Sequence, residues 1–151
     1  MKVKEFVGSG GKIWLLTMPF LVVGLALNIL IPSLFRVGGP PFVLTAISIP
    51  ILMAGVTIWI WSLGLILTKV PRRELITSGP YSLVKHPIYT SASLLVLPWV
   101  GFLLNTWLGA FIGIILYAGS RKYAPEEEGL LAQTFGARWD EYRKKVKIPW
   151  L

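Results

Sequence analysis

The side chains best suited to chemistry lie in one short polar segment, residues 77–89, between two long uncharged stretches. The segment holds the only histidine of the chain, His86, followed by Pro87 and Tyr89 and preceded by Tyr81. A proline directly after His86 can be the first residue of a helix, and helix N-termini favour anionic groups such as carboxylates. The pattern predicts a site that holds a small polar ligand beside lipid. The alternative interpretation is a structured loop whose histidine faces lipid headgroups.

A second cluster, Glu126, Glu127 and Glu128, follows Pro125. A proline followed by acidic residues is typical of an ordinary helix start, where carboxylates complement the helix dipole. The functional interpretation needs a ligand with donors, because a carboxylate only accepts hydrogen bonds; a ribose diol or an ammonium group fits.

Two basic residues, Arg121 and Lys122, come just before the acidic cluster. They have two interpretations as well. They can anchor the end of a membrane helix by reaching toward the headgroups, or they can hold a substrate anion near a cofactor.

The composition indicates an all-α integral membrane protein of one domain. The chain has 151 residues, 54% of them hydrophobic and only 15% charged, and its mean hydropathy is +0.67. Cysteine is absent, which excludes disulfides and thiolate chemistry; with a single histidine, we expect no transition-metal site. The net charge of +8 favours anionic membrane lipid as partner over nucleic acid.

Three uncharged stretches predict four membrane spans of roughly 20 residues or fewer, because the third, residues 87–120, is too long for a single span. The first two lie within residues 1–69, and the other two form a short helical hairpin within residues 70–151, the half that carries both polar clusters. Prolines inside the first span predict kinks. The expected spans are residues 13–35, 45–68, 88–104 and 107–120.

Basic residues predict the orientation of these four spans. In this arrangement all lysines and arginines except Arg36 share one side, which the positive-inside rule assigns to the cytoplasm. Both termini and residues 70–86 would then be cytoplasmic, and both polar clusters would lie on one membrane face. We expect the cytoplasmic membrane of a prokaryote from the small size of the chain.

The tail, residues 125–151, has the spacing of an interfacial amphipathic helix with basic residues on its polar face. Gly136 is expected to bend or break this helix. The predicted apolar stripe consists of Leu131, Phe135, Trp139, Tyr142 and Val146.

Together the two clusters resemble the isoprenylcysteine carboxyl methyltransferase family, part of a wider group of small membrane methyltransferases that includes the phospholipid N-methyltransferases. The resemblance covers about the C-terminal half. Two departures from the family pattern are Lys85, where arginine is usual, and Ser91, where a small residue such as glycine is usual. The matching residues are Gly79-Pro80-Tyr81, Lys85-His86-Pro87, Tyr89, Glu127-Glu128, Leu131, Phe135-Gly136, Trp139, Tyr142, Val146 and Pro149.

The resemblance implies S-adenosylmethionine as methyl donor and a hydrophobic methyl acceptor. It implies a catalytic role for a basic residue, Lys122 or Arg121, before the acidic pair. A carboxylate acceptor needs no general base, whereas an amine acceptor would need one, for which Glu127 is the candidate. The cofactor-binding residues that it implies are Tyr81, His86, Pro87, Tyr89, Glu127 and Glu128.

Two other functions remain open at this point. Sterol-reductase-like membrane oxidoreductases share a similar C-terminal half but use NADPH and are usually longer. A non-catalytic four-span scaffold is the other alternative. Within the methyltransferase interpretation, the acceptor can be a prenylcysteine, a phospholipid amine or a small hydrophobic acid or amine, and the oligomeric state is open.

Overall fold

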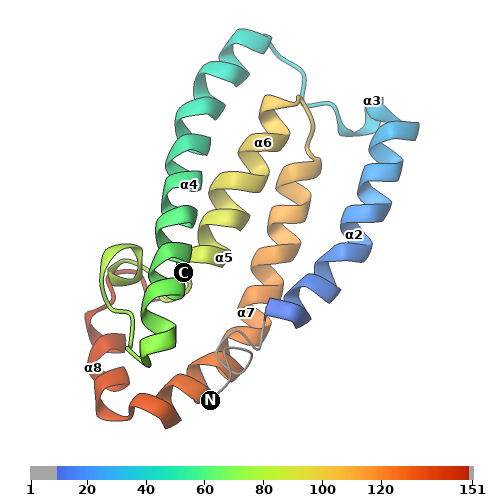
Figure 1. Cartoon of the computed structure of the whole chain (residues 1–151). Helices are drawn as coiled ribbons and strands as arrows, with labels where there is room; N and C mark the ends of the chain where they lie inside the picture. The colour runs from blue at the N-terminus through green and yellow to red at the C-terminus, as the bar shows by residue number, and fades with distance from the viewer. Residues whose placement is uncertain (1–9, 150–151) are drawn as a thin grey trace.

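The computed structural model describes residues 10–149 of the chain, and that part is built from helices joined by short loops. Four rods lie side by side, formed by α2, α4, the α5–α6 segment and α7 (Figure 1). The helices are α2 (Gly10–Leu30), α3 (Pro32–Phe35), α4 (Pro41–Lys69), η1 (Val70–Arg72), η2 (Gly79–Ser82), α5 (Pro87–Ser91), the π-helical η3 (Ala92–Val96), α6 (Leu97–Leu103), α7 (Leu108–Phe135) and α8 (Ala137–Lys145).

The helices bury small residues and expose large apolar ones, the reverse of a water-soluble bundle. On α4 the buried residues are Ser48, Gly55 and Ser62, spaced seven apart on one face. Large side chains such as Met53 and Ile60 are more than half exposed. Small residues let helix backbones approach closely, which is how helices associate in lipid. Both α2 and α4 are long and apolar enough to cross a membrane. The distribution is that of an integral membrane protein.

Helices α6 and α7 cross in close contact. A Cβ atom added at Gly109 would be 2.0 Å from the carbonyl oxygen of Leu97 and 2.9 Å from the Cα of Gly101. One turn later, a Cβ at Gly113 would be 2.3 Å from the carbonyl oxygen of Ser93. Only glycine fits at these crossings, so the backbones of the α5–α6 segment and α7 are in direct contact.

Loops at one end of the rods are joined by hydrogen bonds. The side-chain oxygen of Asn105 accepts from the Gly38 N–H at 2.9 Å, and the Trp107 N–H donates to the carbonyl oxygen of Phe35 at 2.8 Å. The α3–α4 connection and the α6–α7 turn therefore lie together, as Figure 1 shows. The other end of the rods holds residues 70–86 and α8.

The predicted helices were largely right, and several of their boundaries were wrong. The helix predicted for the second span begins at Pro41 instead of residue 45. In the first span, α2 continues through Pro19 but the helix is interrupted before Pro32. The helix predicted for the fourth span, residues 107–120, does not end at residue 120. Helix α7 runs through Pro125 to Phe135. The proline removes one hydrogen bond to the carbonyl of Arg121, and both residues are exposed, so water can satisfy that carbonyl.

Because α7 is continuous, the acidic cluster is not an ordinary helix start. Pro125 is not the first residue of a helix, and Glu126, Glu127 and Glu128 lie in the interior of α7, about five turns after its start at Leu108. Complementing the positive end of a helix dipole therefore does not account for them. Their positions require another explanation.

The tail also differs from expectation. Gly136, with φ of 52°, ends α7 and starts α8, as predicted. The apolar stripe, however, does not face outward: Trp139, Tyr142 and Val146 are buried against Leu75 and neighbouring residues of α7. A hydrophobic stripe predicts that one face of a helix is buried but not whether lipid or protein covers it, and here protein covers it.

Four spans with a cytoplasmic Thr77 remain our prediction for the topology; Lys2 and Lys4, which contributed to it, lie outside the described residues. The chain has no cysteine, so single substitutions give a clean background. Ser33→Cys and Thr77→Cys are both at exposed positions, at opposite ends of the rods. A membrane-impermeant thiol reagent should label Ser33→Cys in intact cells and Thr77→Cys only after lysis. Labelling of Thr77→Cys in intact cells would refute the orientation.

Candidate functional site

A cavity of about 530 Å³ lies between α2, α4, α7, α8 and the loop that joins α4 to α5. The size is that of a cofactor or small-ligand site, and such sites combine apolar walls with a few polar groups. Its walls are formed by Gly10, Gly11 and Trp14 of α2, Leu63, Ile66 and Leu67 of α4, Val70, Glu74, Leu75, Ile76, Tyr81, Lys85, His86, Ile88 and Tyr89 of the following segment, Glu127 and Leu131 of α7, and Trp139 and Tyr142 of α8.

The two polar clusters of the sequence meet at this cavity. Tyr81, His86 and Tyr89 line it from the α4–α5 loop and the start of α5, and Glu127 lines it from α7. Along α7, the inward positions follow the three-and-four spacing of a helix face, which turns Glu127 inward and Glu126 to the surface. Residues about forty positions apart in the chain therefore share one polar wall.

Glu128 lies behind this wall. Its Oε1 accepts a hydrogen bond from Lys85 Nζ at 2.5 Å and lies 3.3 Å from His86 Nε2. The three side chains are 19%, 14% and 11% exposed. Burial raises the pKa of the Glu128 carboxyl, but the hydrogen bonds from His86 and Lys85 outweigh it and lower that pKa to about 2. Glu128 is thus ionised and held by two partners at neutral pH.

Other ionisable groups define the edge of the cavity. Burial, with the nearby charge of Glu127, raises the pKa of the Tyr81 phenol, so Tyr81 keeps its proton and can donate it in a hydrogen bond. Glu74 is ion-paired with Lys69 at 2.8 Å, and this hydrogen bond lowers the pKa of Glu74. Both side chains of that pair are more than a third exposed, so it contributes little to stability.

The C-terminal segment holds the loop that carries Tyr81. The Tyr142 hydroxyl donates to the carbonyl oxygen of Tyr81 at 2.7 Å. The N–H groups of Lys147 and Ile148 donate to the carbonyl oxygens of Ser82 and Leu83, at 3.3 and 2.8 Å. Helix α8 and the residues after it therefore form one wall of the cavity and fix the backbone of another.

Comparison with models of known protein families gives one match, to the isoprenylcysteine carboxyl methyltransferase family over residues 42–133. The match covers more than half of the chain and includes both polar clusters. The chain belongs to this family. No curated protein and no solved structure matches it significantly.

Family membership identifies a membrane methyltransferase. The matched range begins in α4, earlier than the resemblance of the C-terminal half suggested, and ends before Phe135. Trp139, Tyr142 and Val146 thus lie beyond the match, although the first two line the cavity together with matched residues.

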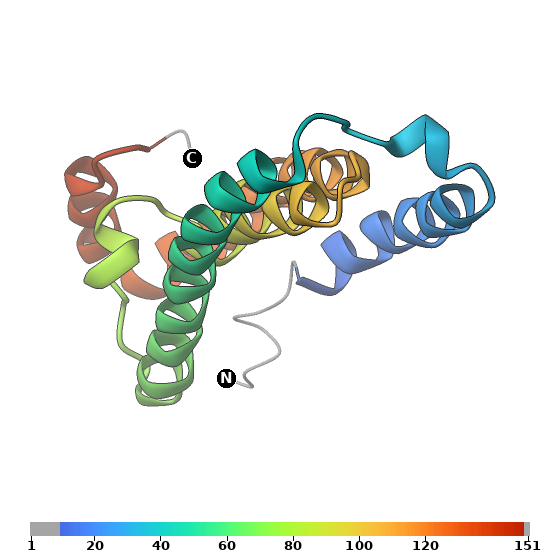
Figure 2. The same cartoon turned by 90° about the horizontal axis from the view of Figure 1, so that it is seen from above.

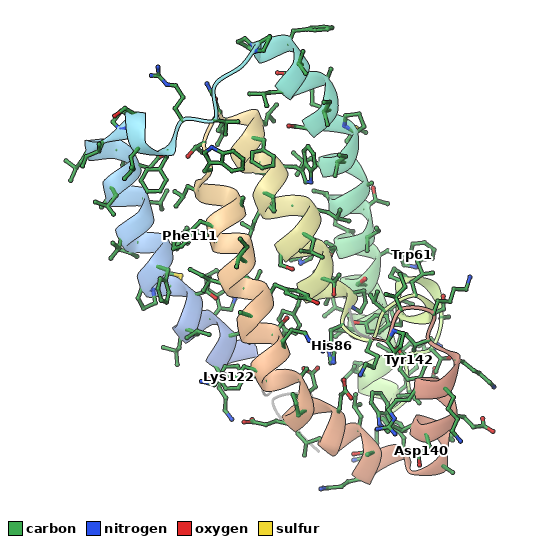
Figure 3. All side chains as sticks on the ribbon, turned by 180° about the vertical axis from the view of Figure 1, so that it is seen from behind. Trp61, His86, Phe111, Lys122, Asp140 and Tyr142 are labelled. Carbon is green, nitrogen blue, oxygen red and sulfur yellow. The ribbon has the colours of Figure 1, made fainter. Side chains whose placement is uncertain are left out.

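The basic residues expected to act in catalysis lie away from the cavity. Arg121 and Lys122 are exposed, neither lines the cavity, and Lys122 Nζ is 5.5 Å from the ring centre of Tyr123. Figure 3 shows Lys122 and His86 on opposite sides of α7. The basic residue that does line the cavity is Lys85, in the first cluster. Pro87, buried at the start of α5, does not line the cavity either and fixes the helix start beside His86.

Several cavity residues were not assigned to the site from the sequence, among them Glu74, Trp139 and Tyr142. The stripe spacing of the tail marked the two aromatic residues as buried, and only the fold shows what they are buried against. The Trp139 indole N–H is buried without a hydrogen-bond partner among the described residues. An unpaired buried donor in a cavity wall is costly, on the order of 1–3 kcal/mol, and suits a ligand that brings an acceptor.

Tyr142→Phe tests whether α8 stabilises the loop that carries Tyr81. The change keeps the ring that packs on Trp139 and removes the bond to the Tyr81 carbonyl, so we expect unfolding stability to fall by about 1 kcal/mol. Tyr123→Phe is the matched control, because its ring keeps both lysine contacts. Thermal unfolding in detergent measures the difference, and equal stabilities would contradict the role of Tyr142.

Proposed function

We propose that the protein transfers the methyl group of S-adenosylmethionine to a hydrophobic or lipid-like acceptor, a carboxylate or an amine, at the cytoplasmic face of a membrane. The observation that carries the proposal is the cavity, which joins a polar wall from both sequence clusters to an apolar wall from α2 and α4.

The residues of the cavity fit this cofactor. S-adenosylmethionine carries an ammonium group and two ribose hydroxyls, which are donors, and Glu127 supplies an ionisable carboxylate to accept from them. Its adenine ring is flat and has acceptor nitrogens, which suits the apolar and aromatic region of Leu75, Leu131 and Trp139, where one indole N–H is unpaired. Tyr81 can donate to a carboxylate or hydroxyl oxygen.

When bound, S-adenosylmethionine supplies a methyl group activated by a sulfonium. The chain's own residues bind and orient the two reactants. Tyr81, His86, Tyr89 and Glu127 hold polar groups along one wall, and the apolar wall excludes water from the reacting atoms. Exclusion of water favours a reaction in which a sulfonium and a carboxylate lose their charges. For an amine acceptor, Glu127 is the candidate to take the proton.

The apolar acceptor would reach the cavity from the lipid. Trp14 and Leu67 line the cavity and are 62% and 66% exposed, so the cavity is open along these two helices. Figure 1 shows α2 and α4 as the two outer rods, with α6 and α7 between them, and Figure 2 shows the axes of α2 and α4 diverging. A hydrophobic chain lying between these helices would have its polar end at the wall that carries His86 and Glu127.

The test is a binding isotherm on detergent-purified protein with S-adenosylmethionine and, in parallel, NADPH. We expect saturable binding of S-adenosylmethionine and none of NADPH. NADPH binding alone would support a reductase instead, and binding of neither would support a scaffold. Methylation of prenylcysteine and of lipid amines by the same preparation then identifies the acceptor.

A further inference from the structure

The arrangement of Lys85, His86 and Glu128 determines which nitrogen of the histidine is left for a ligand. One oxygen, Glu128 Oε1, faces both Lys85 Nζ at 2.5 Å and His86 Nε2 at 3.3 Å. All three side chains are less than a fifth exposed, so water competes little for these contacts. Glu128, behind the cavity wall, thus forms one unit with two residues of the wall itself, Lys85 and His86.

The direction of each hydrogen bond follows from the chemistry of the groups. An ammonium has three donors and no lone pair, so Glu128 Oε1 accepts from Lys85. The carboxyl is ionised above pH of about 2 and cannot donate. The hydrogen between Glu128 and His86 therefore belongs to His86 Nε2. In a neutral imidazole with its hydrogen on Nε2, the other nitrogen, Nδ1, carries a lone pair and accepts.

Nδ1 has no partner among the described residues. His86 occupies the position before the first residue of α5, yet its side chain makes no hydrogen bond to the helix end. The ring lines the cavity, whereas Glu128 does not. The nitrogen left for a ligand is thus Nδ1, and Glu128 reaches the ligand only through His86.

We propose that Lys85 and Glu128 are positioning residues that hold His86 with its hydrogen on Nε2, so that Nδ1 accepts a hydrogen bond from an ammonium group in the cavity. The ammonium is that of the amino-acid end of S-adenosylmethionine, and this identification rests on the proposed function. The assignment gives His86 the role of acceptor instead of donor, and it makes Glu128 a support of the binding wall instead of a direct cofactor ligand.

The single histidine of the chain makes the test unambiguous, because imidazole ¹⁵N resonances of histidine-labelled protein arise from one residue. At a pH where the ring is neutral, we expect a protonated-nitrogen signal from Nε2 and a lone-pair signal from Nδ1. A ring with its hydrogen on Nδ1 in the wild type would overturn the proposal, whatever the variants do.

Glu128→Gln gives the second arm, since a neutral amide can either accept or donate and no longer selects one tautomer. We expect both tautomers in this variant. Glu126→Gln is the matched control, because that neighbouring carboxylate is exposed, pairs with Lys12 and lies outside the cavity lining. It should leave the wild-type pattern. A Glu128→Gln spectrum identical to wild type would contradict the positioning role.

Adding S-adenosylmethionine gives the third arm. We expect the Nδ1 signal to move as that nitrogen accepts a hydrogen bond, with the hydrogen kept on Nε2. If the isotherm shows binding and the Nδ1 signal does not move, the contact with the ammonium is wrong. If the isotherm shows no binding, the proposed function fails with the ammonium contact, while the tautomer of the unliganded protein still tests the positioning role of Lys85 and Glu128.

Discussion

Glu127→Gln is expected to weaken binding of S-adenosylmethionine by tenfold or more, whereas Glu126→Gln leaves it unchanged. Glu127 lines the cavity, and its neighbour Glu126 is exposed and ion-paired with Lys12. A hydrogen bond to a charged group contributes roughly 1.5–3 kcal/mol, and every 1.4 kcal/mol is about a factor of ten in affinity. The ammonium or ribose hydroxyl of the ligand would lose that contribution when the carboxylate becomes an amide.

The pair is well matched, because both changes remove one negative charge from adjacent positions of the same helix. The two variants should therefore differ little in the electrostatic field around α7, in helix propensity or in detergent binding. The measurement is the dissociation constant from equilibrium binding, with thermal unfolding run beside it. Equal affinities for the two variants would mean that Glu127 does not contact the cofactor.

The rod-like helices were predictable from the sequence because hydropathy alone marks them. Lipid-facing residues need only be apolar, so 13–35 and 45–68 approximate α2 and α4 closely. Helix α7 was not predictable in length. Pro125 is a strong local signal for a helix start, yet the helix continues through it. Arg121 and Pro125 are both exposed, so water can satisfy the freed carbonyl of Arg121. Such solvation is a property of the folded helix and has no sequence signature.

The site was predictable in part for a similar reason. The types and spacing of residues 79–89 and 126–128 identified both clusters, and the cavity brings Tyr81, His86 and Glu127 together. The sequence did not distinguish Glu127 from Glu128, which differ by one step around α7: one faces the cavity and the other faces Lys85. Arg121 and Lys122 were expected in the site from the family resemblance, which implies a basic residue before the acidic pair, but both are exposed and neither lines the cavity.

The contact between α6 and α7 explains how a bundle with few large buried side chains holds the cavity walls in place. Within lipid, apolar surface gains nothing from being removed from water, so close backbone contact must supply the packing energy. The backbones of Gly101 and Gly109 are in direct contact. Gly113 packs against Ser93 of the π-helical segment η3 and against Pro98. These contacts fix the N-terminal part of α7, and the C-terminal part of the same helix carries Glu127 and Glu128.

Gly109→Ala is therefore expected to destabilise the protein by about 3 kcal/mol or more. The new methyl group would lie 2.0 Å from the carbonyl oxygen of Leu97, and neither that atom nor the backbone of Gly101 can move without separating the helices. Forced overpacking typically costs 1–3 kcal/mol and more where the backbone must shift. Gly129→Ala, on the same helix, is the control. Its Cβ would meet nothing within 4 Å, so the higher helix propensity of alanine should stabilise by about 0.5–1 kcal/mol. Thermal unfolding in one detergent compares the two, and a Gly109→Ala protein as stable as wild type would show that α6 and α7 do not cross at this glycine.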